Sequence, residues 1–168
     1  SADEDAALAR LDELLDIARD SLEAKRRVIS EHLESGLFPY TQRYLGTFDN
    51  HFSTIGVNGI NEYVRNLTRD EHDITDEAGA AAAMRLLDRV RERIVAFQER
   101  TGRMYNLEAT PAEGTTYRFA KEDIARFGAA GIRHAGTPEN PYYTNSSQLP
   151  VGFTSDPFLA MALQEPLQ

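Results

Sequence analysis

Apolar residues recur at three- or four-residue steps through the first 35 positions of the chain. This spacing places them on one face of a helix, and it predicts a long helix over residues 3–35. Acidic residues open the stretch and basic residues gather later, an order that suits the helix dipole. Gly36 follows at the position of a C-terminal cap. The expected apolar face consists of Leu8, Leu11, Leu15, Ala18, Leu22, Ile29 and Leu33.

The pattern of residues 37–67 predicts a strand, a turn and a helix. Its start, to residue 45, lacks periodicity, and Pro39 argues against a continuous helix there. The apolar run 52–57 predicts a buried strand. Asn58-Gly59 is expected to form a turn that connects this strand to a short helix over 61–67. An ordinary α/β connection and a ligand-facing turn both fit this pattern.

A second clearly periodic stretch predicts a helix over residues 75–101. Thr75 is the expected N-cap. Side chains of both charges cover the positions outside the apolar face, as is typical of a solvated helical surface. The expected buried face consists of Ala83, Leu87, Val90, Ile94 and Phe97.

The stretch 105–127 predicts a strand (105–109), a polar turn (110–115) and a helix (116–127). The first N–H groups of such a helix lack partners and favour an anion, such as a phosphate or a substrate carboxylate. Glu113 is the only charged residue of the turn. Its carboxyl group could cap the helix or take part in proton transfer beside a bound ligand.

The C-terminal part, residues 142–168, predicts a strand and a last helix. A Gly- and Pro-rich loop precedes it, and the strand region 142–149 has an unusually polar middle. Asp156 and Pro157 form a favourable N-cap and first position for the helix over 157–165.

Composition narrows the function classes. A chain of 168 residues with 41% apolar residues is expected to form one domain. No run reaches the roughly 20 apolar residues of a membrane span. The net charge of −9 argues against binding to nucleic acid or to an anionic membrane. We expect a cytoplasmic protein, since the chain has no cysteine and no visible export signal.

Sequence motifs for common chemistries are absent as well. The four histidines lack metal-ligand spacing, so no metal site is expected. Neither a GxSxG nucleophile motif nor a phosphate-binding GxxxxGK[ST] loop occurs. The polar turns at strand ends support the binding of a small anionic ligand.

Three long runs carry a specific family resemblance. They are KRRVISEHLESGLFPYTQRYLGTFDNHFSTIGVNGINE, YNLEATPAEGTTYRFAKED and PYYTNSSQLPVGFTSDPFLAMALQEPLQ. Together they resemble the anaerobic (class III) ribonucleoside-triphosphate reductase, from about Lys25 onward and in the family's order. NLEATPAEGTTYR and YYTNSSQLPVG are long and unusual strings, whereas the helix at 76–101 is generic.

The resemblance implies an α/β fold with long helices, as a late-middle slice of the ten-stranded α/β barrel of ribonucleotide reductases and glycyl radical enzymes. It also implies a reaction that replaces the ribose 2′-OH of a ribonucleoside triphosphate by hydrogen. In the family, a glycyl radical generates a cysteine thiyl radical, and formate is the usual reductant. A separate S-adenosylmethionine iron–sulfur activase installs the glycyl radical, and a structural zinc lies outside this segment. The family is usually homodimeric.

The resemblance also assigns candidate site residues. Glu113 is expected near the ribose, as the catalytic candidate. The candidates for the substrate phosphates are Thr110, Ala112, Gly114, Thr115 and Thr116. Further residues expected to line the site are Asn145, Ser146 and Ser147.

The chain departs from the family pattern in its radical residues. It has no cysteine and no glycyl-radical segment, so we expect it to be inactive in isolation and to work with the remaining segments of a reductase. Two alternatives stay open. The chain could be a non-catalytic nucleotide-binding module, or an interaction piece that completes a split reductase in trans.

Overall fold

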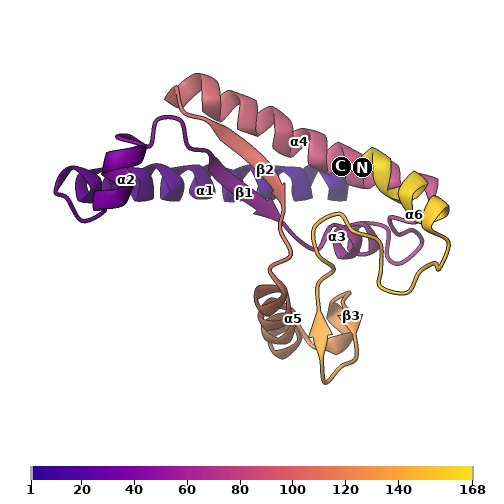
Figure 1. Cartoon of the computed structure of the whole chain (residues 1–168). Helices are drawn as coiled ribbons and strands as arrows, with labels where there is room; N and C mark the ends of the chain where they lie inside the picture. Colours follow the sequence, from indigo (N-terminus) through magenta and orange to yellow (C-terminus); the bar gives the residue numbers. More distant parts are fainter. Residues whose placement is uncertain (1, 168) are drawn as a thin grey trace. The chain divides into compact units, whose positions relative to one another are not determined.

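The protein is described by a computed structural model that covers residues 2–167 (Figure 1). Helices dominate, and the strands are short. The helices are α1 (Ala2–Glu34), α2 (Pro39–Tyr44), α3 (Ile60–Leu67), α4 (Glu77–Thr101), α5 (Glu113–Phe127) and α6 (Pro157–Gln164), with 3-10 turns at Ala129–Gly131 and Glu165–Leu167. The strands are β1 (Ser53–Val57), β2 (Tyr105–Ala109), β3 (Ala135–Gly136) and β4 (Pro141–Tyr142).

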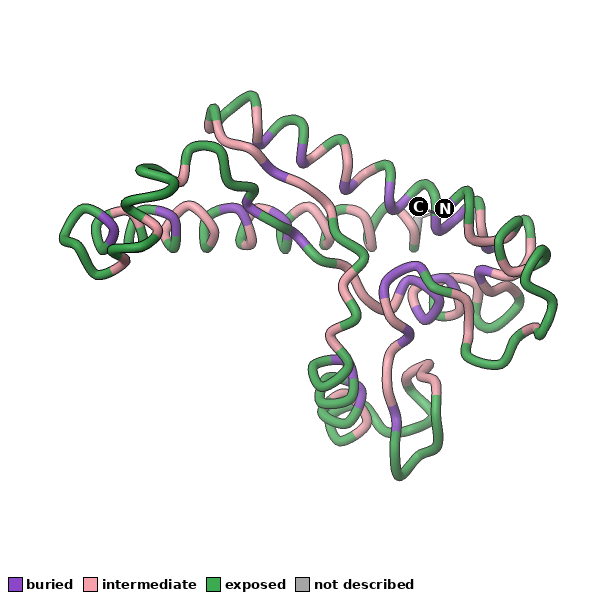
Figure 2. Tube along the Cα trace, viewed as in Figure 1, coloured by how far each residue is buried: buried purple, intermediate pink, exposed green. Residues whose placement is uncertain are grey.

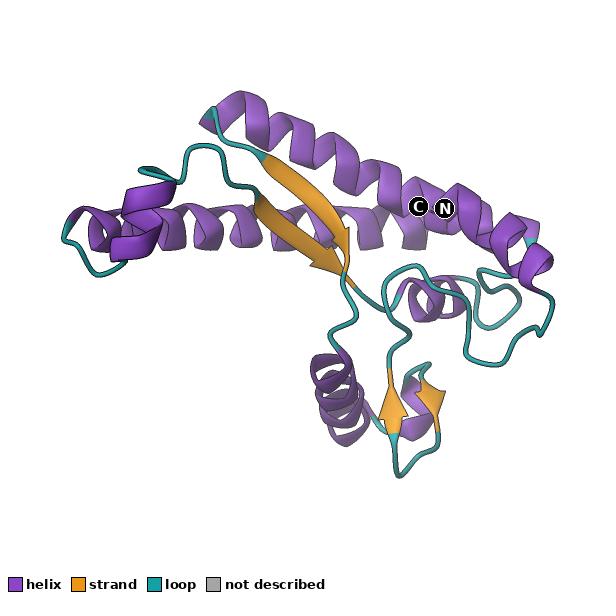
Figure 3. Ribbon diagram, in the orientation of Figure 1, coloured by secondary structure: helices purple, strands orange, loops and turns teal. Residues whose placement is uncertain are grey.

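The strands form two separate pairs. β1 and β2 lie side by side and run in the same direction (Figure 3), and the Ser53 amide donates to the Met104 carbonyl at 2.8 Å. β3 and β4 pair in antiparallel fashion, with Ala135 opposite Tyr142. The strand expected at 142–149 was therefore wrong beyond its first residue. The polar residues that follow Tyr142 bond to α3 and to the C-terminal segment instead of a neighbouring strand.

Contacts between residues gather in two compact units. The first contains the chain up to Ile55 together with Val90–Leu107, and the second contains Gly56–Arg89 together with the chain from Glu108 onward. β1, α4 and β2 each pass from one unit to the other. No helix within residues 2–167 is long and apolar enough to cross a membrane.

In the first unit, α1 packs through arginines as well as through its apolar face. Leu15 and Leu33 are buried as predicted, but Ile29 is 38% exposed, which corrects the predicted stripe. Arg19 is buried instead, with its guanidinium 5.2 Å from the centre of the Phe97 ring. The long apolar stem of an arginine can fill a core position while its charged end finds partners.

Arg93 of α4 approaches the same Phe97 ring from within the first unit. Its guanidinium lies 5.1 Å from the ring centre and donates to Asp16 of α1 at 2.5 Å. The prediction that the charges of α4 form only a solvated face is therefore wrong at Arg93. The predicted buried face of α4 is confirmed, because all its members are at most 6% exposed: Ala83, Leu87, Val90, Ile94 and Phe97.

Arg26 holds the loop between α2 and β1. It is only 8% exposed, and its guanidinium donates to the carbonyls of Phe48 at 2.6 Å and of His51 at 2.7 Å, and to the Ser53 hydroxyl at 2.9 Å. A planar guanidinium with several fixed donors suits such a set of acceptors. The charge of Arg26 thus serves a tertiary contact and not only the dipole of α1.

The second unit has its own apolar core. Figure 2 marks buried positions at intervals along α4, as expected for a helix with one covered face, and the first turn of α3 is buried as well. Gly79 allows the start of α4 to approach the preceding loop, since a Cβ there would lie 1.7 Å from the Asp73 carbonyl oxygen. The members of this core that are at most 3% exposed are Ile60, Val64, Ile74, Ala82, Ala83, Leu87, Ala120 and Leu167.

The starts of α2, α4 and α5 differ most from the predicted ones. Pro39 occupies the first turn of α2, where its missing N–H and fixed φ are tolerated, so the expected irregular segment contains a short helix. Asp76 rather than Thr75 caps α4, because its side chain accepts from the Gly79 amide at 2.9 Å. α5 begins at Glu113, three residues earlier than expected. The Asp156–Pro157 start of α6 is confirmed.

We predict that Arg26→Ala lowers the free energy of unfolding by about 2–4 kcal/mol, because it leaves two part-buried carbonyls and the buried Ser53 hydroxyl without their donor. Urea unfolding followed by circular dichroism measures this change. The matched control is Arg27→Ala, which removes an exposed arginine from the next position of the same helix and should change stability by less than about 0.5 kcal/mol. Equal effects of the two substitutions would contradict the role assigned to Arg26.

Candidate functional site

A cavity of about 440 Å³ lies in the second unit, between α5 and the segment 140–151. α5 contributes one face to it, and the segment after β3 contributes the other. Its lining residues are Glu113, Thr116, Tyr117, Asn140, Tyr142, Thr144, Asn145, Gln148, Leu149 and Val151.

The helical repeat of α5 places its cavity-lining residues next to one another. Glu113, Thr116 and Tyr117 stand at positions i, i+3 and i+4, so all three occur on the same side of the helix. Thr116 is 2% exposed, and its hydroxyl donates to the Glu113 carbonyl at 3.0 Å. The Thr116 hydroxyl proton is therefore engaged within the helix, whereas the Glu113 side chain is exposed at the cavity.

The N-terminus of α5 has no side-chain cap. The amides of Thr115 and Thr116 both donate to the Ala112 carbonyl, at 2.9 and 3.0 Å. Within residues 2–167, no acceptor is found for the amides of Glu113 and Gly114. Ala112 itself has φ 33°, a left-handed conformation that costs an ordinary residue roughly 1–2 kcal/mol. The turn thus leaves two donors for an anion beside the cavity.

The segment after β4 divides its polar residues between the cavity and the core. Asn145 lines the cavity. Ser146 and Ser147 are 2% and 4% exposed and outside the lining. The Ser146 amide donates to the Asn58 side chain at 3.2 Å, and the Ser147 hydroxyl donates to the Leu167 carbonyl at 3.0 Å. These two serines hold the segment in place.

The other candidates for phosphate contact, Thr110, Ala112, Gly114 and Thr115, belong to the turn and the first turn of α5, outside the cavity lining. Thr110 packs on β1, because a Cβ at Gly56 would lie 2.1 Å from its hydroxyl oxygen. Only a glycine allows this approach.

Tyr143 ties the two walls of the cavity together. Its hydroxyl donates to Asp123 of α5 at 2.6 Å. Burial raises the pKa of Tyr143 above its ordinary value, and the hydrogen bond and negative charge of Asp123 raise this pKa further. The phenol therefore remains a hydrogen-bond donor throughout the neutral range.

The charge of the cavity restricts its ligand. Glu113 is the only charged residue among the described lining residues, and none of them is a lysine, arginine or histidine. Tyrosine, leucine and valine side chains form apolar walls between amide and hydroxyl groups. This environment suits an uncharged group with several hydrogen-bonding positions, next to an anion at the α5 amides. No group of three or more potential metal ligands occurs in the described part of the chain.

Sequence reasoning missed most of the lining. A signal for Tyr117 existed, because it stands four residues after Glu113 in a predicted helix. Thr144, Gln148, Leu149 and Val151 lie within the quoted string YYTNSSQLPVG, but nothing in the string indicates which members face a cavity.

The family model described as "Anaerobic ribonucleoside-triphosphate reductase" matches residues 1–168. The chain belongs to the anaerobic ribonucleoside-triphosphate reductase family. The enzyme of that name from Escherichia coli K12 is 30% identical over 113 residues, which are 67% of this chain and 15% of the E. coli protein. The enzyme of phage T4 is 27% identical over 95 residues, again 15% of its length. The chain thus spans about 15% of these curated reductases.

Solved reductase structures share the fold. The anaerobic ribonucleotide reductase of Thermotoga maritima with glycerol in its active site aligns with a TM-score of 0.80 and 23% identity, over 98% of this chain and 27% of that one. The same enzyme in complex with dATP and CTP aligns with a TM-score of 0.80 and 24% identity, over 99% of this chain and 28% of that one. The α/β arrangement of this reductase segment is therefore that of the family.

We predict that Tyr143→Phe lowers the free energy of unfolding at pH 7 by about 1–2 kcal/mol, since it removes a hydrogen bond to a carboxyl group. Because the folded-state pKa of Tyr143 is raised above 10.0, this stabilisation is complete below pH 10 and is lost as the pH rises toward the folded-state pKa. Urea unfolding of wild type and variant between pH 7 and 11 measures both effects.

Tyr142→Phe is the matched control. The Tyr142 hydroxyl makes no hydrogen bond to another group within residues 2–167, so the substitution should change the free energy of unfolding by less than about 0.5 kcal/mol. A loss as large as that of Tyr143→Phe would contradict the tie between the segment and α5.

Proposed function

We propose that this chain forms part of the substrate site of an anaerobic ribonucleoside-triphosphate reductase. The enzyme would convert ribonucleoside triphosphates to deoxyribonucleoside triphosphates by glycyl and thiyl radical chemistry, in a ten-stranded α/β barrel to which β1 and β2 contribute. The observation that carries this proposal is the position of Glu113, beside both the uncapped N-terminus of α5 and the cavity.

The proposed arrangement divides the substrate by charge. The triphosphate would accept hydrogen bonds from the amides of Glu113 and Gly114, because a helix N-terminus carries donors and a positive dipole end. The uncharged ribose and base would occupy the cavity, since its described lining has hydroxyl and amide groups and no cation. Glu113 would face the ribose and exchange a proton with a hydroxyl group. Family membership supports this assignment.

The radical-carrying residues must come from elsewhere in the enzyme. The chain contains no cysteine, so it holds neither a thiyl radical nor thiolate ligands for zinc. Its residues would bind and orient the nucleotide and handle a proton at Glu113. The remaining reductase segments and the activase are proposed partners, with formate as the reductant.

A second candidate follows from the exposed apolar side chains of α1. Leu14, Ile17 and Val28 are 49%, 62% and 47% exposed. A chain that completes a split reductase in trans would cover such residues with the other polypeptide. Restoration of reductase activity on mixing the chain with the complementary segments would support this alternative. A Leu14→Glu variant should then restore less activity than the wild-type chain.

We predict that Gly114→Pro weakens ribonucleoside-triphosphate binding at least about tenfold, because proline removes one amide donor that would face the phosphates. Proline is tolerated in the first turn of a helix, so circular dichroism should remain unchanged. Calorimetric titration with ATP, CTP, GTP and UTP measures the affinity.

Gly114→Ala is the control for this substitution. It keeps the amide, and a Cβ at this position meets no atom within 4 Å. Its affinity should stay within about threefold of wild type, since threefold corresponds to less than 1 kcal/mol. Equal weakening by both variants would contradict the use of the amide.

We predict that Glu113→Gln, placed in a complete reductase that carries this segment, lowers turnover by about 10²-fold or more while nucleotide affinity changes little. The amide of glutamine keeps the size of the side chain but cannot exchange the proton. Single-turnover kinetics and equilibrium binding separate the two quantities. Equal losses in both would leave Glu113 with a binding role only.

A further inference from the structure

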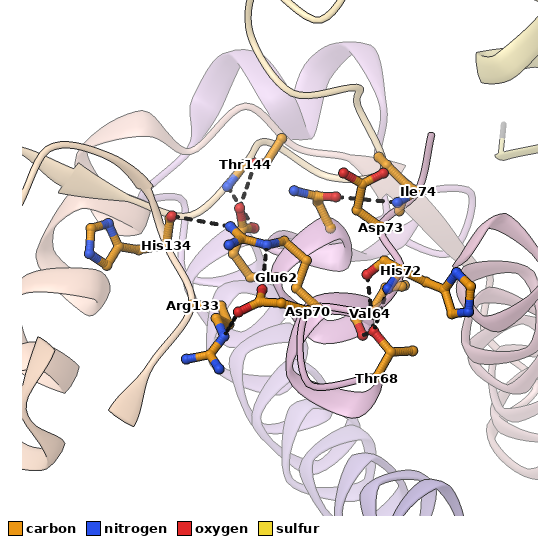
Figure 4. Close-up of polar contacts among 12 residues, drawn as sticks. Glu62, Val64, Thr68, Asp70, His72, Asp73, Ile74, Arg133, His134 and Thr144 are labelled. Carbon is orange, nitrogen blue, oxygen red and sulfur yellow. Dashed lines mark hydrogen bonds and ion pairs between the residues drawn. The ribbon is translucent and has the colours of Figure 1, made fainter. Parts of the chain in front are cut away.

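Glu62 is a buried acidic residue that no part of the proposed chemistry uses. It lies in the first turn of α3 and is 2% exposed. Both of its carboxyl oxygens accept from one residue of the cavity wall: Oε2 from the Thr144 amide at 2.9 Å, and Oε1 from the Thr144 hydroxyl at 2.7 Å (Figure 4). Burying a carboxyl group is unfavourable unless such bonds compensate for the lost water. Its placement therefore needs a reason beyond the packing of α3.

The backbone around Glu62 holds the same turn at further points. The Gly59 amide donates to the Thr144 carbonyl at 2.8 Å, and the Ile60 amide donates to the Ser146 carbonyl at 3.3 Å. Gly59 has φ 77°, so the chain reaches this position in a conformation that favours glycine. The residues on both sides of Asn145 are thus anchored to the start of α3, whereas Asn145 itself lines the cavity.

Backbone strain in the 144–146 turn indicates that the hydrogen bonds to the start of α3 determine the shape of this turn. Ser146 has φ 46°, a conformation that an ordinary residue keeps only when its surroundings hold it there. Ser146 is 2% exposed and its amide bonds to Asn58. Without the bonds to α3, the turn would relax, and the direction of the Asn145 side chain would change with it.

We propose that Glu62 is a positioning residue of the nucleotide site: its two bonds to Thr144 hold the 144–146 turn so that Thr144 and Asn145 face the cavity in one orientation. This inference rests on the proposed function, because it assigns Asn145 to the uncharged, hydrogen-bonding part of the nucleotide. Glu62 touches no substrate itself. It acts through Thr144.

The bonds of Glu62 predict a graded response to substitution. Glu62→Ala removes both acceptors and leaves the Thr144 amide and hydroxyl unsatisfied inside the protein. Glu62→Gln keeps one oxygen for the amide, and its NH₂ group can donate to the hydroxyl oxygen, so it should restore the turn. Thr144→Val loses only the hydroxyl bond and keeps the shape of the side chain. It is the milder variant if Glu62→Ala fails to fold.

The control is Thr68→Val, at the other end of the same helix. The Thr68 hydroxyl bonds to the Val64 and His72 carbonyls at 2.8 and 3.0 Å, remote in sequence from the cavity residues (Figure 4). Its substitution also removes polar contacts from α3, but it leaves the 144–146 turn untouched. It therefore reports what a general loss of stability does to the site.

Hydrogen–deuterium exchange of the 168-residue chain, resolved by peptide, measures the turn without any nucleotide. Exchange in residues 142–149 should accelerate about tenfold or more in Glu62→Ala and less in Thr144→Val, since tenfold corresponds to the loss of one buried bond. It should be near wild type in Glu62→Gln and Thr68→Val. Calorimetry with ATP, CTP, GTP and UTP should show affinity falling in the same order.

Each result decides a separate claim. Unchanged exchange in Glu62→Ala and Thr144→Val would overturn the inference, as would equal acceleration in Thr68→Val. Accelerated exchange with unaltered nucleotide affinity would also overturn it, because the turn would then be held for no purpose at this site. A wild-type chain that binds no nucleotide would contradict the proposed function instead, while exchange still decides whether Glu62 holds the turn.

Discussion

The second unit depends on the attachment of one short turn to the start of α3. Residues 144–146 contribute two carbonyls and two amides to it, and Asn58, Gly59, Ile60 and Glu62 provide the partners. Most of these groups are buried, so each bond that is lost would leave a polar group without water. Because the turn is fixed here, the segments on both sides of it can form one wall of the cavity, and the segment after it also reaches the C-terminal residues.

Two kinds of polar group then meet at the cavity. α5 presents unpaired amides and the Glu113 side chain at its uncapped N-terminus, whereas the opposite wall presents neutral amide and hydroxyl groups. The N-terminus of α5 favours an anion, and the opposite wall favours a neutral hydrogen-bonding group. A ribonucleoside triphosphate, the ligand proposed above, contains both kinds of group in one molecule.

Periodicity predicted the elements with one apolar face, and it failed where a charged side chain has a tertiary partner. The buried face of α4 follows from its repeat alone. Arg26 and Glu62 look like ordinary surface charges in the sequence, because their partners, the 48–53 loop and Thr144, are distant along the chain. Glu113 and Asn145 could be found from their strings, but the burial of Ser146 and Ser147 depends on Asn58 and on Leu167, which no local pattern indicates.

The most direct test of the proposed nucleotide site is ¹⁵N chemical-shift mapping of the chain during titration with a ribonucleoside triphosphate. We predict the largest shifts at the backbone amides of Glu113 and Gly114 and at the side-chain amide of Asn145. Inorganic triphosphate should shift the first two and leave Asn145 unchanged. Shifts confined to α2 or α6, or shifts at Asn145 alone without the α5 amides, would contradict the proposed division of the nucleotide between the helix N-terminus and the cavity.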